Sequence, residues 1–363
     1  MKNYLSQLAR SLDPYVPGEQ PRDKQYIKLN TNENPYPPSE KVAEAISGEI
    51  GKLRLYPDPE ATGLREVLAR YYSLETDQIF VGNGSDEVLA FAYPAFFSGG
   101  YVLFPDITYS FYPVYAGLFN TDYKEIPLRE NFVIDPSDFL PKGEISEGET
   151  AEAEKPAGIL IPNPNAPTGR LLSLSELEGI IAGNPETVVL VDEAYVDFGG
   201  DSAACLVNKY DNLLVVMTLS KSRSLAGLRV GFALGNKVLI AALNTVKNSF
   251  NSYTLDRLAQ VGAMAAMADE AYFQETRNKI LATRARVADR LTKMGFQVIP
   301  SAANFIFVSH GQKAAEDLFN GLRSRGILVR YFKKPLIADF LRITIGTDEE
   351  MDAFLKVIGE LTD

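Results

Sequence analysis

Short runs of apolar residues, each ending in a polar or glycine- and proline-rich cluster, follow one another between residues 79 and 235. Stretches with helical spacing separate these runs, which read IFV, YVLF, GILI, VVLV, LLVVMTL and LRVGFALG in chain order. Strands that are apolar on both faces and alternate with helices are typical of a mainly parallel sheet with helices packed on both sides. The pattern therefore predicts an α/β domain.

The segments on either side of this central region have other patterns. The first forty or so residues are rich in proline and asparagine, which predicts an extended arm lying on another part of the protein. Helical spacing dominates residues 255–294, and the remaining sequence alternates short strands and helices, which indicates a smaller α+β unit. We expect three parts: an arm with part of the small domain at 1–45, a large domain at 46–255 and a small C-terminal domain at 256–363.

Composition narrows the classes of protein that this chain of 363 residues can belong to. Asp and Glu number 47 against 36 Lys and Arg, and this excess works against a nucleic-acid binder or a protein drawn to anionic membranes. The sequence shows no signal-peptide core and no run approaching the ~18 apolar residues of a membrane span. A single cysteine fits a reducing compartment. We therefore expect a cytoplasmic protein without nucleic-acid or membrane partners.

The lone histidine and the lone cysteine weaken several familiar chemistries. They cannot form a multi-histidine metal site or a zinc cluster, so we expect no metal. A Ser-His-Asp triad would have to use His310, which we interpret as a solvated histidine between a strand and a turn. We interpret Cys205 as a small buried apolar residue. Catalysis must then depend on lysine, carboxylates, arginine, tyrosine and a cofactor.

Charged residues directly follow two of the apolar strands. Asp192 comes after VVLV, and Lys221 comes shortly after LLVVMTL. Ligands bind at the carboxyl ends of the strands in open parallel sheets, so both residues are expected at the binding edge. One alternative is that the two form a scaffold salt bridge. Because buried pairs of that kind seldom gain net stability, retaining both charges suggests a use.

Other strand ends carry groups suited to an anion and a flat ring. Ser85 and Asp86 follow IFVGNG and precede a helix, which indicates either a phosphate pocket of free N–H groups or a plain helix cap. Arg229, eight residues beyond Lys221, is a good anion clamp. Tyr109 places an aromatic ring at the same edge.

One mechanism uses nearly all of these groups. A lysine at a partly desolvated edge has a lowered pKa and can form a Schiff base with an aldehyde. A helix N-terminus with Ser220 and Arg229 would hold a phosphate, Tyr109 could stack on a heterocycle, and an aspartate could keep a pyridine nitrogen protonated. The residues therefore predict pyridoxal phosphate as the ligand.

At this point the residues also carry a family resemblance. The chain resembles the fold-type I pyridoxal-phosphate aminotransferases and, within them, the histidinol-phosphate aminotransferases. The resemblance runs almost from end to end, over the motifs LDPYVPG, LNTNENP, LYPDP, GNGSDE, DITYS, NPNAPTG, VDEAYVDF, TLSKS, AGLRVGF, SAANFIFV, GILVRYF and LRITIGT. It implies a large domain with a mainly parallel sheet between helices, a smaller α+β domain and an N-terminal arm.

The resemblance also implies catalytic roles. Lys221 would bind the cofactor covalently and then move the proton, Asp192 would bind the pyridinium nitrogen, and Tyr195 would hydrogen-bond the phenolic oxygen. Tyr109 would lie against the ring. The cofactor phosphate would be held by Ser85, Asp86 (through its backbone N–H), Ser220 and Arg229, with Tyr56 reaching it from the neighbouring subunit. The protein would then be a homodimer with composite sites.

One position departs from the family pattern. The residue before Pro-Thr-Gly is usually an asparagine that contacts the phenolic oxygen, whereas here it is Ala166, preceded by Asn165. Either Asn165 takes over this contact after a small backbone shift, or the contact is lost and Tyr195 serves alone. We favour Asn165.

Substrate selection is expected to fall to the arm and the small domain. Arg342 resembles the arginine that binds α-carboxylates throughout the superfamily. Arg330 and Tyr15 are further candidates, because a site that takes a phosphate and a carboxylate in turn is best served by planar donors. The alternative for the arginines is surface salt bridging. Asn32 lies in a loop expected to cover the site, where turn stabilisation is an equal alternative.

These expectations add up to a functional hypothesis. The resemblance implies a homodimeric transaminase that moves the amino group of histidinol phosphate to 2-oxoglutarate in histidine biosynthesis. The rivals are an aromatic or broad-specificity aminotransferase, a threonine-phosphate decarboxylase of the same fold, and a cofactor-binding regulator. The regulator would need a DNA-binding domain, which neither the arm nor the acidic charge supplies.

We interpret the acidic segment 141–158 as a surface excursion.

Overall fold

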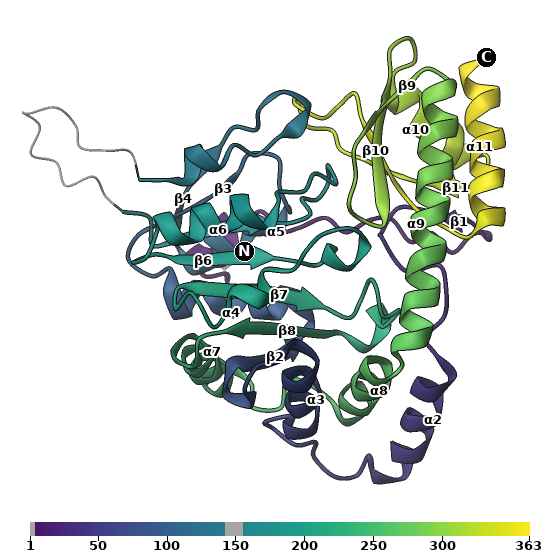
Figure 1. Ribbon diagram of the computed structural model, residues 1–363. Helices are drawn as coiled ribbons and strands as arrows, with labels where there is room; N and C mark the ends of the chain where they lie inside the picture. Colours follow the sequence, from purple (N-terminus) through teal and green to yellow (C-terminus); the bar gives the residue numbers. More distant parts are fainter. Residues whose placement is uncertain (1–3, 142–154) are drawn as a thin grey trace, which may run out of the picture.

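The computed structural model describes residues 4–141 and 155–363, which form sheets of seven, four and two strands (Figure 1). In the seven-stranded sheet every neighbouring pair is parallel except the two that involve β8. The predicted α/β fold with a mainly parallel sheet is confirmed. The strands lie in the order β2 (Ile79–Asn83), β8 (Val230–Gly235), β7 (Leu213–Thr218), β6 (Val188–Asp192), β5 (Gly158–Pro162), β3 (Tyr101–Pro105) and β4 (Asp122–Ile126).

Alternate residues of each central strand point to opposite faces, and each face has its own apolar core. On β5, for example, Ile159 and Ile161 belong to one core while Leu160 belongs to the other. The first core includes residues of α2 (Glu40–Glu49), α3 (Thr62–Tyr72), α6 (Leu174–Gly183) and α8 (Arg257–Ala268). The second includes residues of α4 (Gly84–Phe96), α5 (Phe111–Phe119) and α7 (Lys237–Phe250). Burial on both faces explains why these strands read as continuous apolar runs.

The smaller domain is built on a four-stranded antiparallel sheet with its own core. Its order is β12 (Arg330–Tyr331), β13 (Leu341–Thr344), β10 (Phe305–His310) and β9 (Phe296–Ile299). The helices packed with it are α9 (Glu270–Lys293), α10 (Ala315–Ser324) and α11 (Asp348–Thr362). A parallel pair, β1 (Ile27–Lys28) with β11 (Ile327–Leu328), attaches the N-terminal segment to this domain.

The long helix α9 runs from the large domain to the small one (Figure 1). Ala263 and Met267 of α8 share the core of the large sheet, whereas Ile280 and Val287 of α9 share the core of the small sheet. The packing therefore changes from one core to the other between Met267 of α8 and Ile280 of α9. The division at residues 255 and 256 that we predicted from the sequence stays a prediction.

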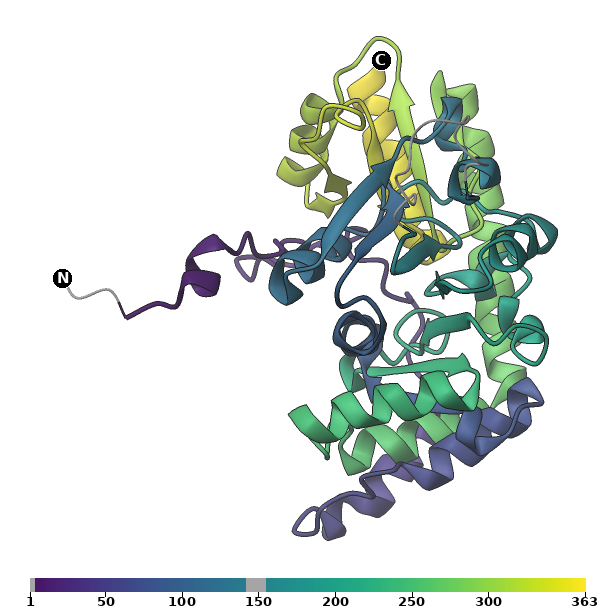
Figure 2. The ribbon, with the colours of Figure 1, turned by 90° about the vertical axis from the view of Figure 1, so that its left-hand side faces the viewer.

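The N-terminal arm leaves the body of the protein at its start. Helix α1 (Gln7–Ser11) has no buried residue and projects outward (Figure 2). The arm then returns to the small domain, where Leu29 is buried in the core. Single turns of 3-10 helix complete the structure: η1 (Ile50–Lys52), η2 (Thr76–Gln78), η3 (Glu130–Phe132), η4 (Pro136–Phe139), η5 (Val196–Phe198), η6 (Ala203–Leu206) and η7 (Ala226–Leu228).

Three details bear on the sequence interpretation. Cys205 is exposed, so the expectation that it is buried is wrong; its thiol donates a hydrogen bond to the Ser202 carbonyl. Strand β4 was not predicted, because it is the outer strand of the sheet and its residues are mostly polar and exposed. Most of the acidic segment 141–158 lies outside the described residues.

Candidate active site

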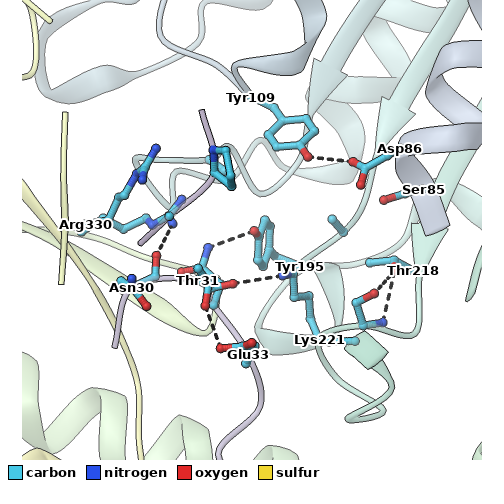
Figure 3. Close-up of a pocket in the computed structure, with 18 of the residues that line it drawn as sticks. Asn30, Thr31, Glu33, Ser85, Asp86, Tyr109, Tyr195, Thr218, Lys221 and Arg330 are labelled. Carbon is cyan, nitrogen blue, oxygen red and sulfur yellow. Dashed lines mark hydrogen bonds between the residues drawn. The ribbon is translucent and has the colours of Figure 1, made fainter. Parts of the chain in front are cut away.

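A cavity of about 330 Å³ lies where the ends of β6 and β7 meet the N-terminal arm and the small domain (Figure 3). Its walls combine residues that are far apart in sequence but that belong to the predicted site. Twelve predicted site residues line it: Tyr15, Asn32, Ser85, Asp86, Tyr109, Asp192, Tyr195, Ser220, Lys221, Arg229, Arg330 and Arg342.

Lys221 extends from the turn after β7 toward the arm (Figure 3). Its Nζ donates a hydrogen bond to the Thr31 carbonyl, at 3.3 Å, and lies 6.0 Å from the centre of the Tyr195 ring. Burial, reinforced by the positive charge of Arg342, lowers the pKa of Lys221 to about 8. An appreciable fraction of this amine is therefore neutral, and nucleophilic, close to neutral pH.

Asp192 is the last residue of β6 and is 6% exposed. Its Oδ2 accepts a hydrogen bond from the Tyr112 hydroxyl at 2.9 Å, and its Oδ1 accepts one from the Ala194 N–H at 3.2 Å. Burial raises the pKa of Asp192 to about 6, and these two hydrogen bonds oppose the shift. The carboxylate is thus mainly ionised at neutral pH and has no ion-pair partner among residues 4–141 and 155–363, which suits a cationic ring nitrogen.

Lys221 and Asp192 do not pair with each other. Within residues 4–141 and 155–363, no ion pair joins the two, and both side chains line the cavity. The alternative of a scaffold salt bridge is therefore wrong. Neither charge is neutralised by the other, so both groups can interact with a ligand.

The corner near the start of α4 is built for an anion. Helix α4 begins at Gly84, so the backbone N–H groups of Ser85 and Asp86 belong to its first turn and have no partner within the helix. The alternative that Ser85 or Asp86 caps the helix is wrong, because Asn83 occupies the cap position. Arg229 lies beside this turn, with its Nη2 at 2.9 Å from Asp86 Oδ2.

Two glycines allow this close approach. Gly84 has φ +81°, and a Cβ there would lie 2.6 Å from the Arg229 guanidinium. A Cβ on Gly231 would lie 2.2 Å from the Ser85 backbone nitrogen. Glycine is therefore required at both positions for the arginine and the helix start to share one corner.

Tyr109 and Ser220 complete the part of the site built on the large sheet. The Tyr109 hydroxyl donates to Asp86 Oδ1 at 2.7 Å, which places its ring on the wall of the cavity (Figure 3). The Ser220 backbone N–H and hydroxyl both contact Thr218 Oγ1, at 3.1 and 2.9 Å. Thr218, the last residue of β7, thereby holds Ser220 in place beside Lys221.

The arm and small domain supply the opposite wall. Arg342 Nη2 donates to the Asn30 carbonyl at 3.0 Å, and Arg330 Nη2 donates to the Val16 carbonyl at 3.0 Å. The Nε of Arg342 is buried and has no hydrogen-bond partner among the described residues. These two arginines are therefore not in surface salt bridges, and the unpartnered Nε suits an incoming oxyanion.

Two predicted residues do not join the cavity wall. Asn165 is fully buried, and its amide donates to the Ile107 carbonyl at 2.9 Å, while its neighbour Ala166 lines the cavity instead. Tyr56 is 78% exposed and stacks on Tyr253 with ring centres 4.8 Å apart.

His310, which we did not expect in the site, ends β10 and packs edge-on against Phe296. It does not line the cavity.

Some residues of the site were missed by the sequence interpretation. Tyr112 follows Tyr109 by three residues in an apolar helix, so it reads as a core residue until its hydroxyl is seen to reach Asp192. Thr31 and Glu33 come from the arm, and Glu33 accepts hydrogen bonds from Thr31 Oγ1 and Lys28. Thr31 and Glu33 both lie in the Asn-rich motif LNTNENP, but the motif does not indicate which residues they contact.

The donor set fits pyridoxal phosphate. It combines an amine with a lowered pKa, a buried carboxylate, an aromatic wall and an anion corner around one cavity. No group of three or more potential metal ligands occurs in the described residues. Within the same residues, no helix is long and apolar enough to cross a membrane.

Comparisons with known proteins agree with this chemistry. The family model "Aminotransferase class I and II" matches residues 24–358. The chain belongs to the class I and II aminotransferases. It is 54% identical, over the full length of both chains, to a protein from Dechloromonas aromatica named histidinol-phosphate aminotransferase 2. It is also 54% identical to the histidinol-phosphate aminotransferase of Clostridium acetobutylicum, over 99% of each chain.

The fold of this aminotransferase matches a solved structure as well. A histidinol-phosphate aminotransferase from Sinorhizobium meliloti, in complex with pyridoxal-5'-phosphate, superposes with a TM-score of 0.86 at 24% identity. The match covers 100% of this chain and 98% of the other. The predicted family, enzyme class and cofactor are confirmed, and the individual roles of the site residues stay predictions.

Proposed function

We propose that this aminotransferase moves the amino group of histidinol phosphate to 2-oxoglutarate, as a step of histidine biosynthesis. The observation that carries the proposal is the joining of Lys221, Asp192 and two arginines around one cavity. The names of the full-length relatives at 54% identity support the same substrate. Its location in the cytoplasm is part of the proposal and rests on the single cysteine.

Each wall of the cavity has a task in this reaction. Bound pyridoxal phosphate supplies the aldehyde and the electron-withdrawing ring that amino transfer requires. Asp192 would hold the ring nitrogen in its protonated form, and the α4 corner with Ser220 and Arg229 would hold the phosphate group. Lys221, with a pKa of about 8, can accept a proton from the substrate carbon and return it two bonds away, to the carbon on the other side of the amino nitrogen.

The substrates differ in the anion that they present. Histidinol phosphate carries a phosphate and no carboxylate, whereas glutamate and 2-oxoglutarate carry two carboxylates. Arg330 and Arg342 lie on the same wall, and Arg342 keeps an unpartnered N–H. A guanidinium donates hydrogen bonds to two oxygens of either anion in a similar geometry, so this pair can serve both half-reactions.

We further propose that the enzyme is a homodimer with composite sites. Exposed apolar residues occur on two segments joined by the Tyr56–Tyr253 stack, namely Ile50, Leu53, Leu55, Tyr56, Phe250 and Tyr253. The projecting arm also exposes Tyr4 and Leu8. A second subunit would cover these surfaces and bring the partner subunit's Tyr56 to the cofactor phosphate.

A substrate panel tests the proposed reaction. Purified protein with pyridoxal phosphate and 2-oxoglutarate is assayed with histidinol phosphate, phenylalanine and phosphothreonine, and glutamate and carbon dioxide are measured as products. We expect kcat/KM for histidinol phosphate to exceed that for phenylalanine by roughly 10²-fold or more. Ready turnover of phenylalanine with little turnover of histidinol phosphate would support the broad-specificity rival, and release of carbon dioxide would support the decarboxylase.

Complementation tests the composite site. Lys221→Ala and Tyr56→Ala subunits are each expected to have low activity, and they are mixed under conditions that exchange subunits. One site of each mixed dimer then regains an intact Lys221 and an intact Tyr56 from different subunits, so activity should rise above that of either variant alone. No gain, in a mixture shown to contain mixed dimers, would contradict the shared site.

A further inference from the structure

The side chain of Asn32 connects the arm, the small domain and the site. Its Nδ2 donates to the Tyr195 hydroxyl at 2.9 Å. Its Oδ1 accepts from the Thr344 hydroxyl at 3.0 Å, and its backbone N–H donates to the same hydroxyl oxygen at 3.0 Å. Asn32 is 1% exposed, so these bonds form away from bulk water.

This arrangement determines the direction of the hydrogen bonds that join Thr344, Asn32 and Tyr195. The Thr344 hydroxyl accepts from the Asn32 N–H, so its single proton is directed to Asn32 Oδ1. That contact identifies the oxygen of the amide and leaves the NH₂ group facing Tyr195. The Tyr195 oxygen is then an acceptor toward Asn32, and its own proton remains available for donation.

The ring of Tyr195 packs mainly on apolar side chains, and the amine of Lys221 lies 6.0 Å from its centre. Its ring packs edge-on against Phe305, with centres 5.1 Å apart, and against the small apolar cluster of Ala166 and Ala303. Within the described residues, the Tyr195 hydroxyl accepts the hydrogen bond from Asn32 and donates none. Asn32 therefore supplies the polar contact that orients this hydroxyl at the cavity.

The backbone of Asn32 explains why an asparagine is used. Its φ of 57° lies in the left-handed region, which asparagine tolerates better than most residues. Its carbonyl accepts a hydrogen bond from Asn304 Nδ2 at 3.0 Å, which pins the turn to the small domain. The amide is thus held in place by the backbone as well as by Thr344.

We propose that Asn32 is a positioning residue that offsets the missing asparagine at position 166, by polarising Tyr195 and directing its proton to the cofactor's phenolic oxygen. The inference rests on the proposed function, because it assigns the Tyr195 proton to bound pyridoxal phosphate. It also replaces both earlier alternatives: Asn165 is turned toward Ile107, and Tyr195 does not act alone.

The effect is measured on the visible absorption of the bound cofactor as a function of pH. A weaker hydrogen bond to the phenolic oxygen makes the bound chromophore hold its proton more tightly, so the midpoint of its titration rises. For Asn32→Gly, which keeps the left-handed turn, we expect a rise of about 0.5 to 1 pH unit. We expect kcat to fall more than KM changes.

A double-mutant cycle separates positioning from structural damage. In a Tyr195→Phe background, Asn32→Gly should no longer move the midpoint, because the hydroxyl through which it acts is gone. Asn120→Gly is a matched control, since Asn120 has φ 51° at the end of α5, away from the cavity, and should leave the midpoint unchanged. Thr344→Val is a second route to the same shift, because it frees the Asn32 amide without altering the turn residue.

The outcomes distinguish the inference from the function on which it rests. An unchanged midpoint in both Asn32→Gly and Thr344→Val, or an equal shift in the Tyr195→Phe background, would overturn the inference alone. Failure of the unmodified protein to develop a visible band with pyridoxal phosphate would overturn the proposed function and the inference together.

Discussion

The two walls of the cavity differ in how their residues come together. On the large-sheet wall, Asp192 and Lys221 follow neighbouring parallel strands, so the sheet alone brings them to one edge. On the opposite wall, Asn32 and Arg342 come from segments more than 300 residues apart and meet through hydrogen bonds between the arm and the small domain. The first wall is set by local strand patterns, and the second depends on how separate parts of the chain pack.

The difference assigns the two walls different work. The sheet wall carries the groups that would hold the cofactor and move the proton. The arm and small-domain wall carries the arginines for the substrate anion. We therefore expect substitutions on the sheet wall to reduce kcat with every substrate, and substitutions of the two arginines on the other wall to act mainly through KM.

The largest effect is expected at Lys221. Lys221→Ala removes the amine that would bind the cofactor and move the proton, so transamination should fall by at least about 10³-fold. The measurement is glutamate formation from histidinol phosphate and 2-oxoglutarate. Activity within tenfold of the unmodified protein would show that the proton is moved by another group.

On the substrate wall, Arg342→Leu is expected to have the next largest effect. It removes charged hydrogen bonds to the substrate anion, so kcat/KM for 2-oxoglutarate should fall by roughly 10- to 100-fold, mostly through KM. Arg323→Leu serves as a control, because Arg323 pairs with Glu19 on the surface and does not line the cavity. Equal losses in the two variants would argue against a substrate role for Arg342.

The pKa of Lys221 predicts how cofactor loading depends on pH. Burial lowers this pKa to about 8, and only the neutral amine attacks the aldehyde, so loading speeds up as pH rises. The rate at which cofactor-free protein binds pyridoxal phosphate should increase about tenfold from pH 7 to pH 9 and then level off. A rate that keeps rising to pH 10.5 would indicate an ordinary lysine pKa.

A smaller effect is expected from Tyr112→Phe. The Tyr112 hydroxyl donates to Asp192 Oδ2, so its loss removes one hydrogen bond from the carboxylate and raises the pKa of Asp192 further. We expect cofactor binding to weaken about 2- to 10-fold, measured by equilibrium dialysis near pH 6 and again near pH 8. The weakening should be greater at pH 6, where more of Asp192 is protonated, and the opposite order would contradict this account.

The same contrast explains what could be predicted from the sequence. The strands of the large sheet are apolar on both faces and end in distinctive residues, so the fold and Asp192, Lys221 and Arg229 could be predicted. The outer strand β4 was missed because its exposed residues carry no apolar pattern. Cys205 was placed in the interior because a small residue among apolar neighbours reads as buried.

The hydrogen-bond partners of these residues could not be predicted from the sequence pattern. The motif LNTNENP drew attention to Asn32, but its bonds to Tyr195 and Thr344 span 163 and 312 residues. Asn165 was expected at the cofactor because it is adjacent to Ala166 in sequence. Adjacent residues of a turn point in different directions, and here the amide of Asn165 faces Ile107 instead.

A crystal structure of the protein with pyridoxal phosphate bound is the most direct test of the central claim. The account predicts the ring between the two charged groups, with its aldehyde carbon joined to Lys221 Nζ and its nitrogen about 2.6–3.2 Å from an Asp192 oxygen. A cofactor bound with its ring nitrogen facing any other residue, or with its phosphate away from Arg229 and the start of α4, would contradict it.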